Sequence, residues 1–401
     1  MRTHLVRSVW GLMALLLPLT IEAQDFESMI KACDEGIHFY MERNYSPVTQ
    51  LVYTCPPLEV QSSKDAVNHM FSWKEGLADG YGKGMSDGPL IGGTLLEGLA
   101  DRWKVEQDGS LQADADKIAR GLLNLANVPG HRGFVARGIC ADDGRTICAN
   151  TSIDQITHWV HGLWRYSTSE MGRKAYVKEY KKLLVDVARY IERMMTPENG
   201  YNIGMADGTV PDTRGICYMY GDHLWPHEAP RLPMVYIAAF MMTGDEHWKE
   251  MYESVVDWAL QRTLDLRGMS EEEIGGRMPC YSLYQAMCAL ELILSYESDT
   301  ERTQQILKAM SLFSKTARRR SVNADPANPP YGMTWDGELV LTQLMDPGFI
   351  WGGLNERFLM DSILREDLTK GGWCRAAHIY AALWKYIRGQ RIFQVGGLGK
   401  S

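Results

Sequence analysis

The chain has 401 residues, of which 45% are hydrophobic, and it carries a formal net charge of -8 at pH 7. This length is enough for one large hydrophobic core or two ordinary ones. The mild acidity argues against a nucleic-acid-binding protein, which would need a clustered basic surface. The single basic run, at residues 318–320, ends a helix-like segment and fits a solvated face or favourable helix-end charges.

The first 23 residues have the pattern of a secretory signal peptide. Arg2 and Arg7 give a positive start, and residues 9–19 form an apolar stretch that is too short for a membrane-spanning helix. Ala23 closes a cleavage site, and no cysteine follows it that could carry a lipid anchor. We therefore expect a periplasmic or secreted protein without stable membrane insertion. The alternative is the apolar first helix of a cytosolic domain.

All eight cysteines follow Ala23, and an oxidising compartment would permit disulfide bonds among them. No CxxC pair occurs, so neither a zinc ribbon nor a thioredoxin-like site is indicated. Cys140 and Cys148 flank the turn ADDGRT, and a hairpin at residues 133–148 would place them opposite each other. A bridge between them is one interpretation, and small buried thiols are the other.

Apolar residues at helical spacing predict helices along most of the chain. Short loops rich in glycine, proline and aspartate separate most of these helices, and residues 133–148 give the best strand signal. We expect an all-α fold with one small β-hairpin in a loop. The predicted helices are 93–103, 115–126, 153–166, 176–195, 233–242, 248–264, 281–296, 303–317, 352–364 and 373–387.

The predicted helices alternate in character. Helices such as 153–166 and 281–296 combine tryptophan, histidine or small residues with buried-looking polar groups and should face the interior, as should 89–103 and 373–387. Others, such as 174–195 and 303–317, are charged along one face and should lie outside. Unlike pairs recurring about every 60 residues predict stacked αα-hairpins, with room for about six pairs in a closed ring. We expect residues 24–401 to form one (α/α)6-barrel domain, with an open α-solenoid as the alternative.

The richest chemistry lies on the helix predicted at residues 153–166. Wound at ~100° per residue, the segment TSIDQITHWVHGLWRY aligns Asp154, His158, His161 and Arg165 in one narrow stripe. This combination suits a cavity where protons move and an anion is bound. The alternatives are helix capping by Asp154 and ordinary structural roles for the histidines.

Glycoside cleavage generally needs one or two carboxylates beside the scissile bond, and several acids are suitably placed. Asp154 stands in the first turn of its helix, and Asp87 precedes another inner helix in GMSDGPL. An N-cap or turn role is the alternative for Asp87. Glu97 is a weaker candidate because it lies in the middle of a helix.

Aromatic, histidine and arginine residues gather near the predicted loop–helix junctions, as in GDHLWPHEAP. Aromatic faces pack on the C–H faces of sugar rings, and an arginine fork pairs with a carboxylate such as that of a uronic acid. Core packing and ordinary ion pairs are the alternatives for each residue. The substrate-binding candidates are His158, His161, Arg137, Asp222, His223, Trp225, His227, Arg231, Trp351, Arg375 and His378.

No cofactor or metal is predicted. Two histidines spaced i,i+3 without an HExxH motif are weak evidence for zinc. The sequence also has no GxxxxGK[ST] phosphate loop, no GxGxxG after a strand and no GxSxG elbow. Their absence weighs against nucleotide enzymes and serine esterases.

With these features, the chain resembles six-hairpin (α/α)6-barrel glycoside hydrolases, in particular bacterial unsaturated glucuronyl and rhamnogalacturonyl hydrolases and related β-glucuronidases. SDGPLIGGTLLEGL places Asp87 where the unsaturated glucuronyl hydrolases have an acid before an inner helix. NTSIDQITHWVHGLWRY places Asp154 at their general acid/base aspartate, which protonates and hydrates a 4,5-unsaturated uronide. The hemiketal then collapses to release the sugar. DHLWPHEAPR departs from an Arg-Gly-rich segment of that family, so a saturated β-glucuronide is at least an equal alternative.

The sequence thus favours an exported, exo-acting glycoside hydrolase that removes a terminal glucuronic or 4,5-unsaturated uronic acid from an oligosaccharide or polysaccharide. Asp154 would be the general acid/base, Asp87 its carboxylate partner, and His158 and His161 would tune or orient the acid. An arginine would hold the substrate carboxylate. Two alternatives stay open: a polysaccharide lyase on an α/α toroid, with a tyrosine or histidine base, and a non-catalytic glycan-binding protein.

Overall fold

The computed structural model describes residues 23–68, 84–85, 87–147, 150–206, 217–265, 278–323, 336–348 and 375–397. Helices make up most of this part of the chain, and each of them is too short or too polar to span a lipid bilayer. The α-helices are α1 (Ala23–Asn44), α2 (Ser63–Asn68), α3 (Gly88–Glu106), α4 (Leu111–Ala126), α5 (Ile153–Thr168), α6 (Lys174–Met194), α7 (Arg231–Thr243), α8 (Glu246–Leu264), α10 (Cys280–Tyr296), α11 (Thr300–Asn323), α12 (Asp336–Leu344) and α14 (Arg375–Gly397).

The expectation of an all-α fold is confirmed for these residues. The predicted helices that fall within them are present, and α4, α8 and α10 end at the predicted residue. The periodicity did not predict α1, α2 or α12. Helix α12 is buried over nearly its whole length, so its sequence has no polar stripe to mark it. The helix predicted at 352–364 and residues 1–22 of the expected signal peptide lie outside the described residues.

The expected hairpin at residues 133–148 forms a tight turn instead of two paired strands. Ile139 and Ile147 make a single antiparallel bridge, and the Cys140 backbone N–H donates to the Thr146 carbonyl at 2.8 Å. The chain before the bridge is paired elsewhere, because the Arg137 carbonyl accepts from the backbone N–H of Gly88 at 2.9 Å. Cys148 lies outside the described residues, so its bridge to Cys140 stays a prediction.

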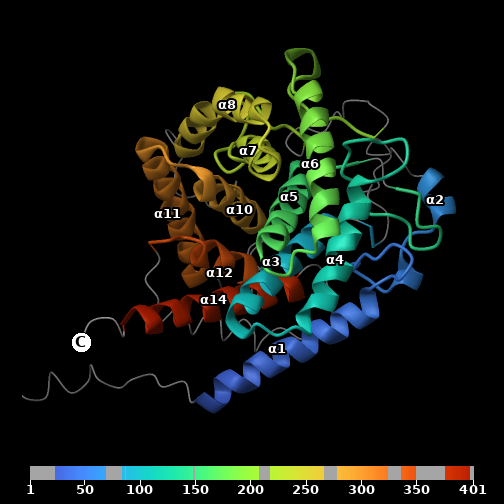
Figure 1. Ribbon diagram of the computed structural model, residues 1–401, viewed down its shortest axis with the longest axis vertical. Coiled ribbons are helices and arrows are strands. Elements are labelled where there is room, and N and C mark those ends of the chain that lie inside the picture. The colour runs from blue at the N-terminus through green and yellow to red at the C-terminus, as the bar shows by residue number, and fades with distance from the viewer. Residues whose placement is uncertain are drawn as a thin grey trace, which may run out of the picture.

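Six helices pack side by side in a closed circuit that runs α3, α5, α7, α10, α12, α14 and back to α3 (Figure 1). Helices α4, α6, α8 and α11 each pack against the circuit helix that precedes them in the chain, and α1 packs against α14. The circuit helices are mostly buried, whereas α6 and α11 keep an exposed charged face. The predicted division into inner and outer helices is therefore confirmed for α3, α5, α6, α10, α11 and α14.

The circuit helices begin at the same end of the molecule, because residues near their starts contact one another. Asp154, in the first turn of α5, pairs with Arg231, the first residue of α7. His378, near the start of α14, lies 3.4 Å from Glu338, near the start of α12. We call this the N-terminal end of the circuit. The positive ends of several helix dipoles therefore face the same region.

Helices α3 and α5 approach each other closely because glycine faces glycine. A Cβ atom on Gly162 would lie 2.4 Å from the Cα of Gly93, and one on Gly93 would lie 2.3 Å from the His158 carbonyl oxygen. Neither backbone can move without disturbing the packing around it. This contact sets the spacing between the two helices that carry Asp87, Asp154 and the interior charges described below.

The variant Gly162→Ala should lower the free energy of unfolding by about 1–3 kcal/mol, because the methyl group overpacks the α3–α5 contact. Urea or thermal unfolding measures the change. Gly109→Ala is the matched control, because a Cβ there meets nothing within 4 Å. If both variants unfold at the same urea concentration or temperature, the α3–α5 contact can accept a methyl group and the prediction is wrong.

Candidate functional site

Polar side chains from several chain segments meet at the N-terminal end of the circuit. They come from the turns before α3 and α7, from the loop before α5, and from the first turns of α5, α7 and α10, with His158 one turn further along α5. These groups contact one another or lie within electrostatic range. We call them the N-terminal cluster: Asp87, Arg137, Asp154, Gln155, His158, His227, Glu228, Arg231 and Tyr281.

Asp154 pairs with an arginine instead of capping its helix. Nη1 of Arg231 donates to Oδ1 of Asp154 at 2.5 Å. The Arg231 side chain is 1% exposed, whereas that of Asp154 is 24% exposed and so reaches solvent. Ser152, at the N-cap position of α5, makes no side-chain capping bond. Removing the carboxylate would leave a buried charge unpaired, so the pair also fixes α5 against α7.

Asp87 forms the second aspartate–arginine pair of the cluster. Its Oδ1 accepts from Arg137 Nη1 at 3.4 Å and from Gln155 Nε2 at 2.9 Å. Asp87 occupies the N-cap position of α3 but makes no side-chain capping bond there. Gln155 follows Asp154 directly in the sequence, so the two aspartates come from neighbouring segments of one site. The structure therefore places the two predicted catalytic carboxylates on adjacent elements, with the residue next to Asp154 in contact with Asp87.

Arg231 has hydrogen-bonding capacity that its partner does not use. Its Nε and Nη2 atoms are buried and have no hydrogen-bond partner among the described residues. These two donors lie on the same edge of the planar guanidinium, which is the geometry that binds a carboxylate with two parallel bonds. Buried polar groups without partners are rare in proteins and call for an explanation such as a ligand or ordered water.

His158 adds further unbonded polar atoms to the cluster, and Gln285 on α10 also has unbonded polar atoms. His158 lies one turn after Asp154 on α5, and its ring packs against Tyr284 with centroids 5.4 Å apart. Neither His158 ring nitrogen and neither polar atom of the Gln285 side chain has a hydrogen-bond partner within the described part. Burial, followed by the nearby His378, lowers the pKa of His158 well below its usual range, so its ring is neutral at neutral pH.

His227 and Glu228 lie in the turn that leads into α7. Burial, followed by the nearby Arg231, lowers the pKa of His227 well below its usual range. The pKa of Glu228 shifts upward: burial raises the pKa of its carboxyl to about 7, even though the charge of Arg231 acts to lower it. The cluster therefore contains a carboxyl group that can hold a proton near neutral pH.

The remaining candidates within the described residues lie in three places. Asp222 and His223 are exposed on the loop before α7, and the ring of His223 packs on Tyr218. Trp225 is half-buried, and its backbone N–H donates to Glu228. His378 is buried on α14, with its ring against Tyr284. Trp351 and the side chain of Arg375 lie outside the described residues.

His161 belongs to a different region from the one we expected. Its Nε2 lies 2.7 Å from Oε2 of Glu291, and its Nδ1 lies 3.6 Å from Oε2 of Glu97. Those acids lie on α10 and α3, toward the middle of the circuit. His161 follows Asp154 by seven residues, which is about two helical turns. The two residues therefore share one face of α5 but lie at different depths in the circuit.

The sequence did not predict three residues of the cluster: Gln155, Glu228 and Tyr281. Glu228 stands beside His227 in WPHEAP, the segment already singled out for its polar and aromatic residues. That concentration of polar residues before a helix was the available signal. Gln155 and Tyr281 carried none, because a glutamine in a first helical turn and a tyrosine beside an apolar run are both ordinary.

A network of buried charges fills the interior beyond the N-terminal cluster. Asp101 is fully buried and forms ion pairs with Arg165, Lys385 and Arg388. Burial alone would raise the pKa of Asp101, but these three cations outweigh it and lower the pKa to about 2. Lys385 also lies 2.8 Å from Oε1 of Glu97. The network therefore ties α3, α5 and α14 together, and Arg165 extends it to Glu291 on α10.

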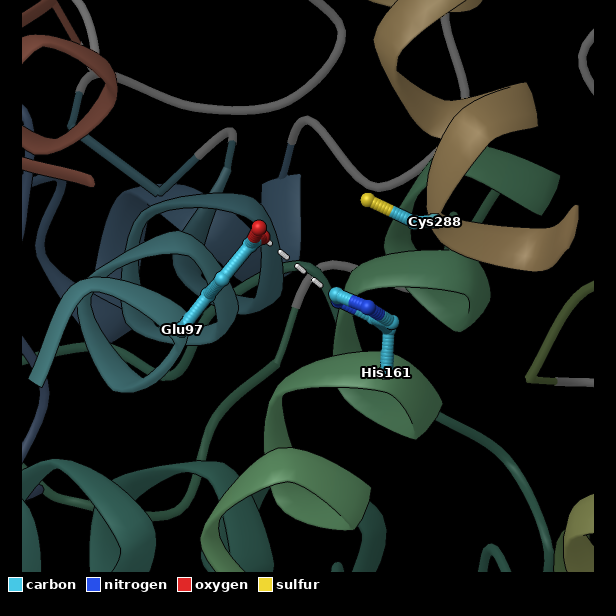
Figure 2. A group of neighbouring side chains, drawn as sticks. All are labelled: Glu97, His161 and Cys288. Atoms are coloured by element: carbon cyan, nitrogen blue, oxygen red, sulfur yellow. Dashed lines mark ion pairs between the residues drawn. The ribbon is translucent and has the colours of Figure 1, made fainter. Parts of the chain in front are cut away.

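Glu97, His161 and Cys288 form a group whose atoms could hold a metal ion, since a ligand atom of each lies within 4.8 Å of the others. Figure 2 shows the three side chains meeting from α3, α5 and α10. The Tyr284 hydroxyl, however, donates to Oε2 of Glu97 at 2.5 Å, and burial raises the pKa of the Cys288 thiol well above its usual range. Metal ligation needs a thiolate, so these contacts favour a hydrogen-bonded core.

A surface groove of about 780 Å³ between α8 and α11 is less suited to catalysis. Two of its acids pair with one cation: Arg302 donates to Glu253 at 2.6 Å and to Asp257 at 2.7 Å. It also lies away from the starts of the circuit helices. The N-terminal cluster is therefore the candidate active site.

No protein-family model matches the sequence, and no curated protein matches it either.

Asp101→Asn should lower the free energy of unfolding by about 3–5 kcal/mol at neutral pH, because it breaks a buried ionic network. The contribution of Asp101 is complete above its ordinary pKa of 3.8 and disappears as the pH falls toward about 2. Urea unfolding at several pH values should therefore show the difference from wild type shrinking over that range.

Asp114→Asn is the control for the interior charge. Asp114 forms an exposed pair with Lys117, and such pairs contribute less than about 1 kcal/mol. Equal, small effects of the two substitutions would contradict a stabilising role for the network.

Proposed function

We propose that this protein is an exported glycoside hydrolase with an (α/α)6 barrel, which removes a terminal uronic acid from an oligosaccharide or polysaccharide. The closed circuit of six helices, with outer helices packed against their predecessors, supports a barrel of αα-hairpins. The uronide is glucuronic acid or its 4,5-unsaturated form. The proposal keeps the activity that the sequence motifs suggested.

One observation carries the proposal: two aspartate–arginine pairs share a buried, polar site at the starts of the circuit helices. Asp87 with Arg137 and Asp154 with Arg231 supply two carboxylates and two guanidinium groups. Both aspartates keep some exposure, at 14% and 24%, so they can reach a bound sugar. Paired carboxylates are the usual equipment for cleaving a glycosidic bond.

The charge of the site suits an anionic sugar. Arg231 has two buried donors on one edge without a partner among the described residues, which suits a uronic acid carboxylate. The starts of several circuit helices meet at this end of the molecule, and their dipoles favour a negative ligand. A neutral sugar would leave the donors of Arg231 unused, so the site should prefer a uronide.

In the proposed reaction, Asp154 is the carboxylate closest to the chemistry. Arg231 holds its Oδ1, which leaves Oδ2 to face water or the anomeric carbon. Asp87 supports it from the neighbouring segment through Gln155. The lyase alternative would need a tyrosine or histidine base. Burial raises the pKa of Tyr281 above its usual range, so its deprotonated form is scarce, and burial lowers the pKa of His158, which makes that ring a weak base.

The test is to incubate the protein with a saturated glucuronide, its 4,5-unsaturated counterpart and the matching uncharged glucoside, and to separate the products by chromatography. We expect release of the uronic acid and little or no cleavage of the glucoside. A gain in ultraviolet absorbance from a polymeric uronate would instead identify a lyase. Binding without any product would identify a glycan-binding protein.

Asp154→Asn should lower turnover of the uronide by at least about 10³-fold, because the amide can neither activate water nor attack the sugar. Asp114→Asn is the control and should keep wild-type rates. Since Asp154→Asn leaves Arg231 without its carboxylate, circular dichroism must first show a folded protein. Asp87→Asn, which does not touch that pair, provides the second measurement. Wild-type rates in folded Asp154→Asn protein would refute the assignment.

A further inference from the structure

The two aspartates of the site leave one catalytic requirement open. Cleavage of a glycosidic bond needs a group that donates a proton to the leaving oxygen. Oδ1 of Asp87 and Oδ1 of Asp154 each accept a hydrogen bond from an arginine, and Gln155 donates to Asp87 as well, so both aspartates are positioned as hydrogen-bond acceptors. A separate acid is therefore required. We propose that Glu228 is this proton donor, an inference that rests on the proposed function.

The position of Glu228 is fixed by the turn that begins α7. Its Oε2 accepts from the backbone N–H of Trp225 at 2.8 Å, and its own backbone N–H donates to the Trp225 carbonyl at 2.9 Å. Its carbonyl accepts from the backbone N–H of Arg231 at 3.2 Å. The carboxyl is thus tied to the same turn as the residue that pairs with Asp154. One oxygen is bound to the backbone, which orients the other.

The surroundings of Glu228 favour a proton donor over a structural ion pair. The residue is 6% exposed, and no ion pair to it occurs within the described part of the chain. Three charged groups act on it: Arg231 and Arg262 favour its ionised form, and Asp154 opposes ionisation. Burial has the largest effect and raises the pKa of Glu228 to about 7. A general acid is most effective when its pKa lies near the working pH.

The other titratable groups of the cluster are less suitable. Burial lowers the pKa values of His158 and His227 well below the usual range, so both rings are neutral and are poor acids. Burial raises the pKa of Tyr281 above its ordinary value, which makes its proton too tightly held. Glu228 is the group in the described cluster that combines a releasable proton with a fixed position.

The resulting step balances without a further reactant. As the bond between the anomeric carbon and the glycosidic oxygen breaks, the Glu228 carboxyl gives its proton to that oxygen. A water molecule adds to the anomeric carbon and passes one proton to the Asp154 carboxylate. Exchange with solvent then returns both side chains to their starting forms, and one water has been consumed.

Glu228→Gln and two glucuronides test the proposal. One substrate carries methanol as its leaving group, which must be protonated, and the other carries 4-nitrophenol, which leaves as a stable anion. We expect Glu228→Gln to lower kcat about 10²–10⁴-fold for the methyl glucuronide and far less for the nitrophenyl glucuronide. A purely structural defect would lower both rates equally.

The pH profile gives a second measurement. In the wild type, kcat/KM should fall as the pH rises above about 7, because Glu228 then loses the proton that it must donate. Glu228→Gln should lose this basic limb. Glu250→Gln is the matched control, since Glu250 is exposed on α8 and should leave both rates and the profile unchanged. Glu228→Asp retains a carboxyl and should keep the basic limb even if it is slow.

The results separate a failure of the Glu228 assignment from a failure of the proposed function. If wild type cleaves glucuronides and Glu228→Gln loses both substrates equally, or keeps the basic limb, Glu228 is not the acid. If Glu228→Gln does not fold, the persistence of the limb in Glu228→Asp supports the proposal, and its loss overturns it. If wild type cleaves no glucuronide while the controls are folded, the proposed function fails, and the role of Glu228 fails with it.

Discussion

The close contact between Gly93 and Gly162 is the constraint on which the rest of the structure depends. It lets the backbones of α3 and α5 approach until a single methyl group would not fit between them. Asp87 and Asp154 stand at the starts of these helices, and Asp101 and Arg165 lie further along them. One contact between glycines therefore positions both the candidate active site and the interior charges. Larger residues at this crossing would move both.

The two polar regions of the circuit differ in how their buried groups are paired. In the interior, Asp101 meets three cations, so its charge is compensated within the fold. At the N-terminal end, His158 and Arg231 have polar atoms with no hydrogen-bond partner among the described residues. Oδ2 of Asp101 and Nζ of Lys385 in the interior also lack a hydrogen bond, but these two atoms lie in an ion pair with each other. Compensated charges stabilise a core, whereas uncompensated polar groups cost stability unless a ligand or water meets them. The ion pairs of the interior therefore suit a structural role, and the unbonded atoms at the N-terminal end suit the proposed binding site.

The sequence predicted the helices well because their amphipathic periodicity is a local property. It also placed Asp87 and Asp154 correctly at helix starts, since turn and capping patterns are local too. It could not assign partners: the pairing of Asp154 with Arg231 joins residues 77 positions apart, and that of Asp87 with Arg137 joins residues 50 apart. The sequence also could not predict that His161 contacts Glu97 and Glu291 and not Asp154. Helical phase shows which face of a helix a residue occupies, but not how far along the circuit it lies. The environment of Glu228 depends on burial, which only the assembled helices reveal.

The ion pair between Arg388 and Asp101 has a consequence for how the chain reaches its native state. Its partners are 287 residues apart in the sequence. Lys385, on the same distant helix, pairs with Glu97 and Asp101 of α3. While the chain is being synthesised, Glu97 and Asp101 therefore lack two of the cations that neutralise them until α14 has emerged. Burying these acids before α14 is present would leave their charges uncompensated, so we expect the circuit to close late in folding. Such dependence on distant contacts is typical of slow folding, during which apolar helix faces stay exposed to chaperones or to aggregation.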